Sequence, residues 1–493
     1  MLELNAANLP HLSGNVVSPS YDRNKVITGI VHFGVGGFHR AHQAMYMDRL
    51  MNAGQAMDWG ICGVGVLAHD EKMAQVMDAQ DCLYTLVLKH PDGTREARVI
   101  GSMTEYLFAP ADPEAVIEKM AAPTTRIVSL TVTEGGYNFH HVTGEFDAEN
   151  PDVVHDLTPQ AAPRTTFGLV TEALARRRTR GIEPFTVMSC DNIQGNGDVA
   201  KKMFTAFAAL KDAELGAWMR ENVAFPNSMV DRITPVTTDE DRAAIAEEFG
   251  IIDQWPVVCE PFEQWVLEDN FTLGRPPFQD AGVQVVHDVA PYELMKLRLL
   301  NSSHQALCYF GYLAGYRYAH EVAQDSLFVA FLLDYMDLEG TPALAPLPGV
   351  DLPLYKRTLI ERFANEYVRD TLARLCAESS DRIPKWLVPV IWHNLEHDGG
   401  IERSAGIVAS WARYAEGTDE SGQPIEIVDA LKVPLMAAAA LQSEDKLAFL
   451  RNRDVFGDLV DNARFTAAYL RTLDTLHHKG ARSAVEELVA LGR

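Results

Sequence analysis

The sequence is short of positive charge, and this shortage excludes two classes of partner. Its 493 residues contain 43 Lys and Arg against 68 Asp and Glu, a formal net charge of −25. A protein with that charge repels nucleic acid and anionic lipid over most of its surface. The charge does not exclude anionic cofactors, because glycine turns and helix N-termini bind phosphate groups with backbone N–H donors. We therefore expect a small-molecule ligand and neither a nucleic acid nor a membrane partner.

Long apolar runs and paired cysteines are also missing. The run "LMAAAALQ" is far shorter than the roughly 20 apolar residues of a membrane helix. The opening "MLELNAANLPHLSGN" has neither the cationic segment nor the apolar core of a signal peptide. The six cysteines form no C-x-x-C pair, which favours buried thiols in a reducing compartment. These features predict a soluble, cytoplasmic protein.

The chain lacks internal repeats and low-complexity tracts, which excludes a solenoid. It is too long for one hydrophobic core, and its pattern changes near residue 288. Later segments have mainly helical periodicity. Earlier ones alternate amphipathic helices with apolar runs that suit a parallel sheet covered on both faces, namely Gly29–Gly37, Trp59–Val66, Tyr84–Leu88, Thr125–Thr133 and Phe185–Asn192.

The predicted fold class is therefore α/β with two domains. Residues 1–288 are expected to form an N-terminal Rossmann-type, doubly wound domain. Residues 289–493 are expected to form a mainly α-helical C-terminal domain for substrate and catalysis. Pro291 would open the first helix of that second domain, since proline is favoured at the first helical position.

A glycine turn follows the first predicted strand, in "IVHFGVGGFHRAH". Gly34 and Gly36 form a G-x-G, and Gly37 and Phe38 continue it into a helix. Such glycines permit a tight turn and let backbone N–H groups approach a pyrophosphate. The third glycine of the dinucleotide fingerprint is replaced by His39. Gly34, Gly36, Gly37 and Phe38 are predicted to bind the cofactor.

Two further readings of this region concern acids and metals. Asp70 follows the second predicted strand, where an acid would hold the adenosine ribose; a solvated surface Asp is the alternative. It lies later than the usual offset of about 20 residues, because a long helix intervenes. His39 and His42 are spaced i, i+3 without a third ligand nearby, so helix packing or phosphate contact is favoured over metal binding. No metal site is predicted.

Several motifs resemble the polyol-specific long-chain dehydrogenases, the mannitol 2-dehydrogenase family. The segment "VAFPNSMVDRITP" (Val223–Pro235) fills that family's Val-Asp-Arg-Ile-x-Pro signature without a gap. The glycine turn with His39 in place of the third glycine is usual in the family. Other matching stretches are "TEGGY" (Thr133–Tyr137), "SCDN" (Ser189–Asn192) and the K-x4-N-x2-H that is formed by Lys296, Asn301 and His304. The matches run from about residue 30 to residue 310.

The resemblance implies an NAD-dependent enzyme that transfers hydride reversibly between a polyol and NAD, without metal. The expected reaction interconverts D-mannitol and D-fructose, with D-arabinitol-type polyols as further substrates. By resemblance Lys296 is the general base, and burial would lower its pKa towards the operating pH. Asn192 and Asn301 would stabilise the alkoxide, and Glu293 would relay the proton. Family members are often monomeric, and we expect a monomer here.

The helix that carries these groups, "PYELMKLRLLNSSHQALCYFGYL", is otherwise apolar. At about 100° per residue in an α-helix, with Lys296 at 0°, Glu293 falls near 60°, His304 near 80° and Asn301 near 140°. The four side chains would share one broad face, next to the crevice between the two domains. By resemblance His304 and Asp231 would hold substrate hydroxyls, with Arg374 and the weaker candidate Lys385.

Three other functions remain as alternatives. A fructuronate or tagaturonate reductase of the same family would need an extra cation for the substrate carboxylate. A catalytically silent nucleotide-binding sensor would have lost Lys296 or both asparagines, and all three are present. A zinc-dependent dehydrogenase would need a Cys/His ligand set, and "HNLEH" lacks the glutamate placement of H-E-x-x-H.

Overall fold

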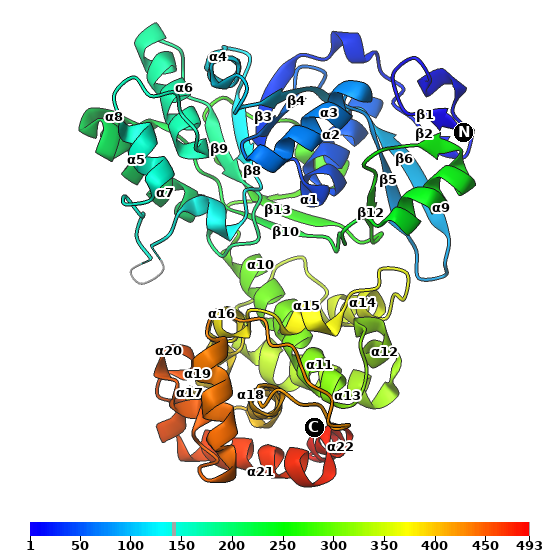
Figure 1. The fold of residues 1–493 in the computed structure, drawn as a ribbon, viewed down its shortest axis with the longest axis vertical. Coiled ribbons are helices and arrows are strands. Elements are labelled where there is room, and N and C mark those ends of the chain that lie inside the picture. Colours follow the sequence, from blue (N-terminus) through cyan, green and yellow to red (C-terminus); the bar gives the residue numbers. More distant parts are fainter. Residues whose placement is uncertain (141–143, 493) are drawn as a thin grey trace. The chain divides into compact units, whose positions relative to one another are not determined.

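The computed structural model describes residues 1–140 and 144–492, and the chain divides into two compact units, Met1–Ala290 and Pro291–Arg493 (Figure 1). Each unit has hydrophobic clusters of its own. The six cysteines are buried free thiols, as the sequence predicted. Within the described residues, no helix is both long enough and apolar enough to cross a membrane.

A five-stranded parallel sheet forms the centre of the first unit (Figure 1). Its order is β7-β4-β3-β8-β9, and every pairing is parallel. The chain starts at the central β3, moves outward on one side and then crosses to the other side at β8. This is the doubly wound order of a Rossmann fold, whose ligands bind where the direction reverses. The strands are β3 (Thr28–Phe33), β4 (Gly60–Gly65), β7 (Met103–Phe108), β8 (Ile127–Leu130) and β9 (Thr186–Ser189).

Both faces of this sheet are covered, because alternate residues of each strand enter different clusters. On β3, Ile30 packs with residues of the helices α2 and α3, whereas Val31 and Phe33 pack with those of α4, α6 and α7. Successive strand residues point to opposite faces, so a strand covered on both faces is mainly apolar. The helices of this unit are α1 (Gly37–Ala41), α2 (Gln43–Asn52), α3 (Glu71–Ala79), α4 (Pro113–Ala121), α5 (Pro151–Leu157), α6 (Thr166–Arg180), α7 (Asn196–Lys211), α8 (Ala213–Asn222) and α9 (Asp239–Phe249).

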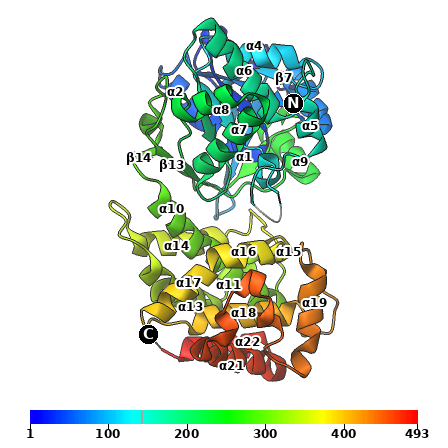
Figure 2. The same ribbon diagram turned by 90° about the vertical axis from the view of Figure 1, so that its left-hand side faces the viewer.

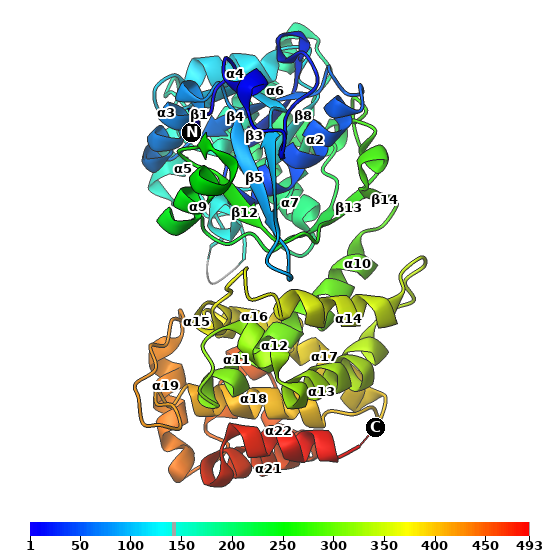
Figure 3. The same cartoon turned by 90° about the vertical axis from the view of Figure 1, so that its right-hand side faces the viewer.

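The predicted strand Tyr84–Leu88 does not belong to the parallel sheet, and that prediction was wrong. It forms β5 (Tyr84–Lys89), which lies beside β12 in Figure 3, in a separate sheet of order β12-β5-β6-β2, and it is antiparallel to β6 (Arg95–Ile100). A tight turn with Gly93 at φ +85° reverses the chain between β5 and β6. The edge of the parallel sheet is instead β7. The remaining strands are β1 (Leu2–Glu3), β2 (Val16–Val17), β10 (Ser228–Asp231), β11 (Ile251–Ile252), β12 (Val257–Cys259), β13 (Gln264–Glu268) and β14 (Gln284–Val286).

The second unit is helical, and no named strand occurs within its described residues (Figure 2). Its core surrounds α11 and α18, and buried Glu339 accepts the backbone N–H groups of Arg403 and Ser404 at the start of α18, at 2.7 and 2.8 Å. The helices are α10 (Ala290–Met295), α11 (Ser302–Leu313), α12 (Ala319–Gln324), α13 (Ser326–Tyr335), α14 (Leu352–Phe363), α15 (Leu372–Cys376), α16 (Ser379–Trp386), α17 (Val388–Glu396), α18 (Glu402–Tyr414), α19 (Lys432–Ala440), α20 (Arg453–Phe456), α21 (Ala463–Lys479) and α22 (Ala481–Ala490).

A π-helix, η6 (Lys296–Asn301), lies between α10 and α11. Its wider turns free backbone carbonyls for other donors. The Ser302 hydroxyl donates to the Leu297 carbonyl at 3.0 Å, and the Tyr335 hydroxyl donates to the Arg298 carbonyl at 3.0 Å. The expectation of a regular α-helix through this stretch is therefore wrong. Hydrogen bonds in a π-helix span five residues instead of four, and such turns occur frequently at functional sites.

Candidate functional site

The turn after β3 requires a glycine at position 34. Gly34 has φ +87°, and a Cβ atom there would lie only 2.1 Å from the carbonyl oxygen of Thr131. The Thr131 hydroxyl in turn donates to the Gly34 carbonyl at 2.7 Å. The ends of β3 and β8 are thus held together at the point where the sheet reverses direction. No residue with a side chain fits this contact.

Gly36 has a different environment, because its position is open. A Cβ atom at Gly36 would meet nothing nearer than the Gly34 carbonyl oxygen, at 4.0 Å. The residue precedes the short helix α1, with extended backbone at φ −92° and ψ −173°. The protein itself therefore leaves room beside Gly36, and a ligand can approach the backbone there.

A pocket of about 600 Å³ lies at this reversal point of the sheet. Its position is where a Rossmann fold binds a dinucleotide, and its size suits a small-molecule site. Three of the predicted cofactor residues, Gly34, Gly36 and Gly37, line it, and so does Asp70. The other walls come from the loop after β8, from residues 150–153 and 164–167, and from Trp255.

Asp70 is held against the end of β4. Its Oδ2 atom accepts the backbone N–H groups of Val66 and Leu67, both at 2.9 Å. Gly65 allows this approach, because a Cβ there would lie 2.6 Å from the Asp70 Cβ. The second carboxylate oxygen, Oδ1, is 3.7 Å from Nε2 of His69, whose side chain is 78% exposed. Asp70 is therefore an ordered wall of the pocket, unlike a solvated surface carboxylate.

His39, which replaces the third glycine, packs inside the protein. Its ring stacks on His32 of β3 with centroids 3.4 Å apart. Nδ1 of His32 lies 2.8 Å from the Ser129 hydroxyl, and its Nε2 lies 2.9 Å from that of Thr131. Burial lowers the pKa of His32 to about 3, and it lowers the pKa of His39 well below the usual range. Both rings are neutral at pH 7 and join α1 to the sheet beneath the glycine turn.

Phe38 and His42 form a second packed group. The Phe38 ring stacks on His42 with centroids 4.9 Å apart, and Phe38 is not among the residues that line the pocket. His42 also contacts Trp265 and lies with Nε2 3.2 Å from the Gln264 carbonyl oxygen. This packing accounts for both histidines of "FHRAH".

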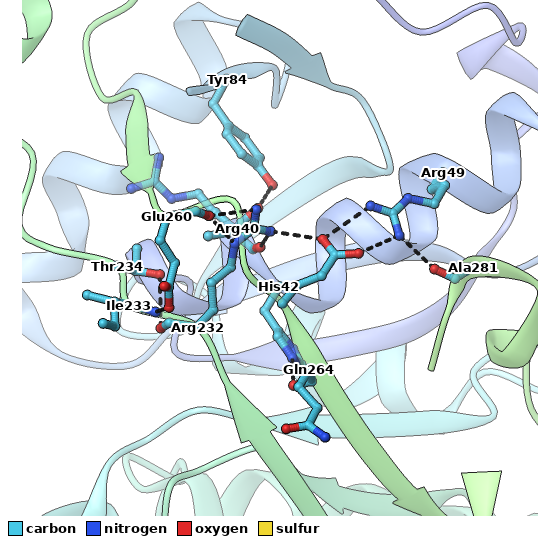
Figure 4. A network of polar contacts seen from close by, with 12 residues as sticks. Arg40, His42, Arg49, Tyr84, Arg232, Ile233, Thr234, Glu260, Gln264 and Ala281 are labelled. Atoms are coloured by element: carbon cyan, nitrogen blue, oxygen red, sulfur yellow. Dashed lines mark hydrogen bonds and ion pairs between the residues drawn. The ribbon is translucent and has the colours of Figure 1, made fainter. Parts of the chain in front are cut away.

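The arginine of the Val-Asp-Arg-Ile signature has a structural role (Figure 4). Buried Arg232 donates to the carbonyl of Ala41 at 2.7 Å and twice to that of Glu260 at 3.1 Å. The Ile233 N–H donates to the Glu260 carboxylate at 2.6 Å. Asp231, the predicted substrate residue, is buried at the end of β10 and pairs in register with Gln264. The hydrogen bonds of Arg232 hold the backbone beside Asp231 in place.

The predicted catalytic residues of the second unit lie around the π-helix. Lys296 is 7% exposed and Asn301 is 4% exposed; Glu293 is also buried, and His304 is half-buried with its ring 4.6 Å from Phe363. In a π-helix the backbone bonds span five residues, so Lys296 and Asn301 lie one turn apart on the same side. The α-helical spacing had put them about 140° apart. The π turn therefore reduces the rotation about the helix axis that separates the two residues.

The remaining predicted residues are more exposed. Asn192 follows β9 in the first unit and is exposed, whereas the preceding Asp191 is buried. Arg374 makes two hydrogen bonds of 2.6 Å to the carboxylate of Asp370, and its side chain is 59% exposed. Lys385 pairs with Asp381 at 2.6 Å. Both pairs are i, i+4 contacts, but only Asp381–Lys385 lies within a helix, α16, where an exposed pair of this kind contributes about 0.3–0.5 kcal/mol.

Metal ligation receives no support from the histidine pairs. His393 and His397 of "HNLEH" stack on each other with centroids 4.3 Å apart. Among residues 1–140 and 144–492, no group of three or more His, Cys, Asp or Glu side chains could hold a metal ion.

The sequence reasoning missed Asp191, Arg232 and Glu260. Asp191 was visible only as the third letter of "SCDN", where the polar residue after it attracted the functional assignment. Arg232 lay inside a recognised signature, but nothing in the sequence indicates that its partners are backbone carbonyls far along the chain. Burial of a charged side chain is the signal that would have identified all three, and only a folded structure provides it.

Comparison with known proteins gives a consistent result over the whole chain. Residues 28–280 match the mannitol dehydrogenase Rossmann domain, and residues 288–477 match the mannitol dehydrogenase C-terminal domain. A mannitol 2-dehydrogenase of Phaeosphaeria nodorum is 47% identical over 490 residues, which cover 99% of this chain and 85% of that protein. One of Aspergillus fumigatus is 46% identical over 494 residues and 98% of each chain.

Solved structures agree. The ternary complex of Pseudomonas fluorescens mannitol 2-dehydrogenase with NAD and D-mannitol has a TM-score of 0.88 and 45% identity, and the match covers 100% of both chains. A D-sorbitol dehydrogenase in substrate-free form has a TM-score of 0.91 and 38% identity, covering 98% of this chain and 100% of that one.

Proposed function

This chain belongs to the mannitol dehydrogenase family, as its motifs predicted, and we propose that it is an NAD-dependent mannitol 2-dehydrogenase. The proposed reaction interconverts D-mannitol and D-fructose, and D-arabinitol and related polyols are proposed as further substrates. The observation that carries the proposal is the pair Lys296 and Asn301, buried one turn apart on a π-helix. An amine and an amide in that arrangement suit removal of a proton from an alcohol.

The pocket of the first unit fits a dinucleotide. Gly34 makes the tight turn, Gly36 leaves space beside its backbone, and Gly37 begins α1. Bound NAD supplies the hydride acceptor for the carbinol carbon. We propose that Asp70 accepts the adenosine ribose hydroxyls, since both of its backbone hydrogen bonds go to Oδ2 and Oδ1 lies beside exposed His69. The same carboxylate would repel a 2′-phosphate and so favour NAD over NADP.

In the proposed mechanism Lys296 takes the proton from the substrate hydroxyl while its amine is neutral. Asn301, on the same side of the helix, would donate its amide N–H to the alkoxide as that charge develops. Asn192 is proposed as the second donor. In the reductive direction, the ammonium of Lys296 donates its proton to the new alkoxide. Glu293, buried on the turn before Lys296, is proposed to pass protons between Lys296 and solvent, outward after oxidation and inward after reduction.

Other side chains would hold the remaining substrate hydroxyls. We propose His304 and Asp231 for this role, with Arg374 and Lys385 as weaker candidates. Nε and Nη2 of Arg374 already donate to Asp370, so a substrate hydroxyl would have to bind the remaining N–H donors of that guanidinium. Polyol hydroxyls are neutral, and a guanidinium whose charge is already matched by a carboxylate suits them better than it suits a substrate carboxylate. This feature favours a polyol over a hexuronate.

A substrate panel tests the proposal. Purified protein is assayed with D-mannitol, D-arabinitol and D-sorbitol in the oxidative direction, and with D-fructose, fructuronate and tagaturonate in the reductive direction. Each assay is run with both NAD(H) and NADP(H), before and after exhaustive chelation. We expect kcat/KM to be highest for D-mannitol and D-fructose with NAD(H), and unchanged by the chelator. Preference for a hexuronate, or loss of activity with removal of stoichiometric zinc, would overturn the proposal.

A further inference from the structure

Thr133, in the loop after β8, has a backbone conformation that side chains disfavour. Its φ is +64° and its ψ is 171°, in a region that essentially only glycine occupies. A β-branched residue with positive φ is an outlier that the surrounding structure must hold in place. Thr133 lines the 600 Å³ pocket together with Val132, Gly135 and Gly136. The strain therefore lies in the pocket wall itself.

The carboxylate of Asp191 holds this loop. Oδ1 accepts the Thr133 N–H at 2.8 Å, and Oδ2 accepts the Val132 N–H at 3.1 Å and the Tyr137 hydroxyl at 2.7 Å. Asp191 is 6% exposed, so these donors replace the water that the charge has lost. The three hydrogen bonds connect the strained residue, the residue before it and Tyr137 to one carboxylate.

Asp191 is itself fixed from the other side. Its carbonyl oxygen accepts a hydrogen bond from Nδ2 of Asn196 at 2.9 Å, and its N–H donates to the Ser189 hydroxyl at 3.3 Å. Asn196 also donates to the Ser228 carbonyl at 2.8 Å and accepts the Ser228 N–H at 2.9 Å. The backbone of Asp191 is therefore held by residues of β9, α7 and β10, and its side chain extends from this fixed backbone to the loop.

We infer that Asp191 is a positioning residue for cofactor binding: its carboxylate keeps Thr133 in the strained conformation and so gives the loop after β8 the shape that lines the pocket. The inference rests on the proposed NAD-dependent function. It assigns to Asp191 no contact with cofactor or substrate. The hydrogen bonds to Oδ1 and Oδ2 of Asp191 offset the cost of the strained Thr133 conformation. The loop therefore has its shape before the cofactor binds.

Asp191→Asn is the sharpest test, because an amide cannot replace both acceptors. If its Nδ2 takes the place of Oδ1, it faces the Thr133 N–H; if it takes the place of Oδ2, it faces the Val132 N–H. In either orientation one backbone donor loses its acceptor. We expect the Kd for NADH, measured by fluorescence titration of the full chain, to rise roughly ten- to a hundredfold.

Tyr137→Phe is the matched control. It removes the third donor to Asp191 but leaves both backbone N–H groups with their acceptors. The Kd for NADH should then stay within about threefold of the unmodified protein. An increase as large as that of Asp191→Asn would show that the buried cluster acts as a whole, and it would overturn the assignment to the carboxylate.

Thr133→Gly tests the role of strain. Glycine adopts the observed conformation at little cost, so it should depend less on the carboxylate. In a double-mutant cycle, Asp191→Asn should raise the Kd for NADH at least about threefold less in the Thr133→Gly background than in the original chain. Equal increases in the two backgrounds would mean that Asp191 supports the fold without acting through Thr133, and would overturn the inference.

The unmodified chain provides a test that does not depend on a variant's folding. Without cofactor, the amides of Val132 and Thr133 should exchange with deuterium more slowly than the amide of neighbouring Gly135, because Asp191 already binds them. Exchange as fast as that of Gly135 would refute a preformed loop. NADH binding by the unmodified chain is measured in the same titrations, so failure of the proposed cofactor is seen there separately from failure of the Asp191 inference.

Discussion

The glycine turn of the first unit and the segment Glu293–His304 of the second unit present polar groups in different ways. At the glycine turn the groups that face the pocket are mainly backbone, and the buried histidines beneath them are neutral and packed. In the second unit the groups are side chains on one helix, with Lys296 and Asn301 buried among apolar neighbours. Backbone groups at the ends of sheet strands are available to a ligand. Within a helix most backbone groups bond to each other, so a ligand meets mainly side chains.

This difference explains where each unit departs from ideal geometry. The first unit needs glycine at φ +87° and a strained threonine, because backbone must be turned toward a ligand. The second unit needs a π-helix, because an α-helix would leave Lys296 and Asn301 about 140° apart. The irregular residues of the first unit change the direction of backbone groups, and the π-helix of the second unit changes the direction of side chains. Substitutions of Lys296 and Asn301 should therefore affect turnover, and substitutions at the glycine turn should affect cofactor binding.

The largest effect is expected for Lys296→Ala. Removing the proposed base should lower kcat for D-mannitol by about 10³–10⁴-fold, the upper part of the range for general acid–base catalysis. The Kd for NADH should stay within about threefold. Steady-state kinetics and a fluorescence titration measure the two quantities. Lys356→Ala is the control, since Lys356 is a second buried lysine of the same unit whose amine binds Asp337. If Lys296→Ala keeps more than a tenth of kcat, Lys296 is not the base.

The asparagines should give the next largest effect. Asn192→Ala and Asn301→Ala are each expected to lower kcat by about 10²–10³-fold, as the loss of one alkoxide donor does. NADH affinity should change little. The double variant should lose less than the product of the two single losses, because groups that act on one atom are not additive. A variant that alters only KM would identify its asparagine as a group that positions the substrate.

Asp70→Ala should have a smaller effect, confined to cofactor choice. Loss of the carboxylate removes an acceptor for the ribose hydroxyls and a source of repulsion for a 2′-phosphate. The ratio of kcat/KM for NAD to that for NADP should fall by about tenfold or more, in keeping with one hydrogen bond to a charged group. His69→Gln, at the exposed neighbour, serves as the comparison and should change the ratio less. An unaltered ratio in Asp70→Ala would mean that another residue selects the cofactor.

A separate prediction concerns stability at low pH, and it involves no change in turnover or cofactor choice. His32 and His39 have pKa values below the ordinary value of about 6.5, because the folded protein buries them neutral. The unfolded chain binds protons that the folded one does not, so the free energy of unfolding falls as pH drops below about 6.5. From pH 7 to pH 5 the loss for a group with a folded pKa of about 3 is about 2 kcal/mol.

His39→Phe should reduce this acid sensitivity while it keeps a ring stacked on His32. Denaturant unfolding at pH 5 and pH 7 measures the change, and the difference in the free energy of unfolding between the two pH values should shrink. His69→Gln removes an exposed histidine and should leave the difference as it was. The same pH dependence in His39→Phe and in the unmodified chain would contradict the assignment of the acid loss to buried histidines.

Much of the first unit could be predicted from sequence, because its signals are local. Mainly apolar runs marked β3, β4, β8 and β9, since a strand covered on both faces has few polar positions. The place of β5 could not be predicted from its own composition, because a run of apolar residues does not specify its partner. The "HPDGT" turn that follows β5 was the available signal for a hairpin.

The site was less predictable than the fold. The motifs indicated Gly34, Asp70 and Lys296 because each residue type suits a chemical task. They did not reveal the π-helix, because the sequence around Lys296 is compatible with an ordinary helix and the irregularity depends on tertiary contacts such as the Tyr335 hydroxyl on the Arg298 carbonyl. Asp191 was overlooked for a related reason: its partners, Val132, Thr133 and Tyr137, are more than fifty residues away.

The π-helix η6 also affects how relatives of this chain are aligned. A π turn closes with one residue more than an α turn, so a protein that lacks one residue here would have the same two flanking helices without the wide turn. In an alignment that difference is a single gap inside an apolar helix. In space the wide turn takes up the extra residue, so the later side chains, His304 included, keep nearly the direction that they have in the shorter chain. Without the wide turn the extra residue would rotate them by about 100° around the helix axis. Two chains that differ by one residue here therefore present the lysine and the histidine in the same directions only if the longer chain forms the π-helix.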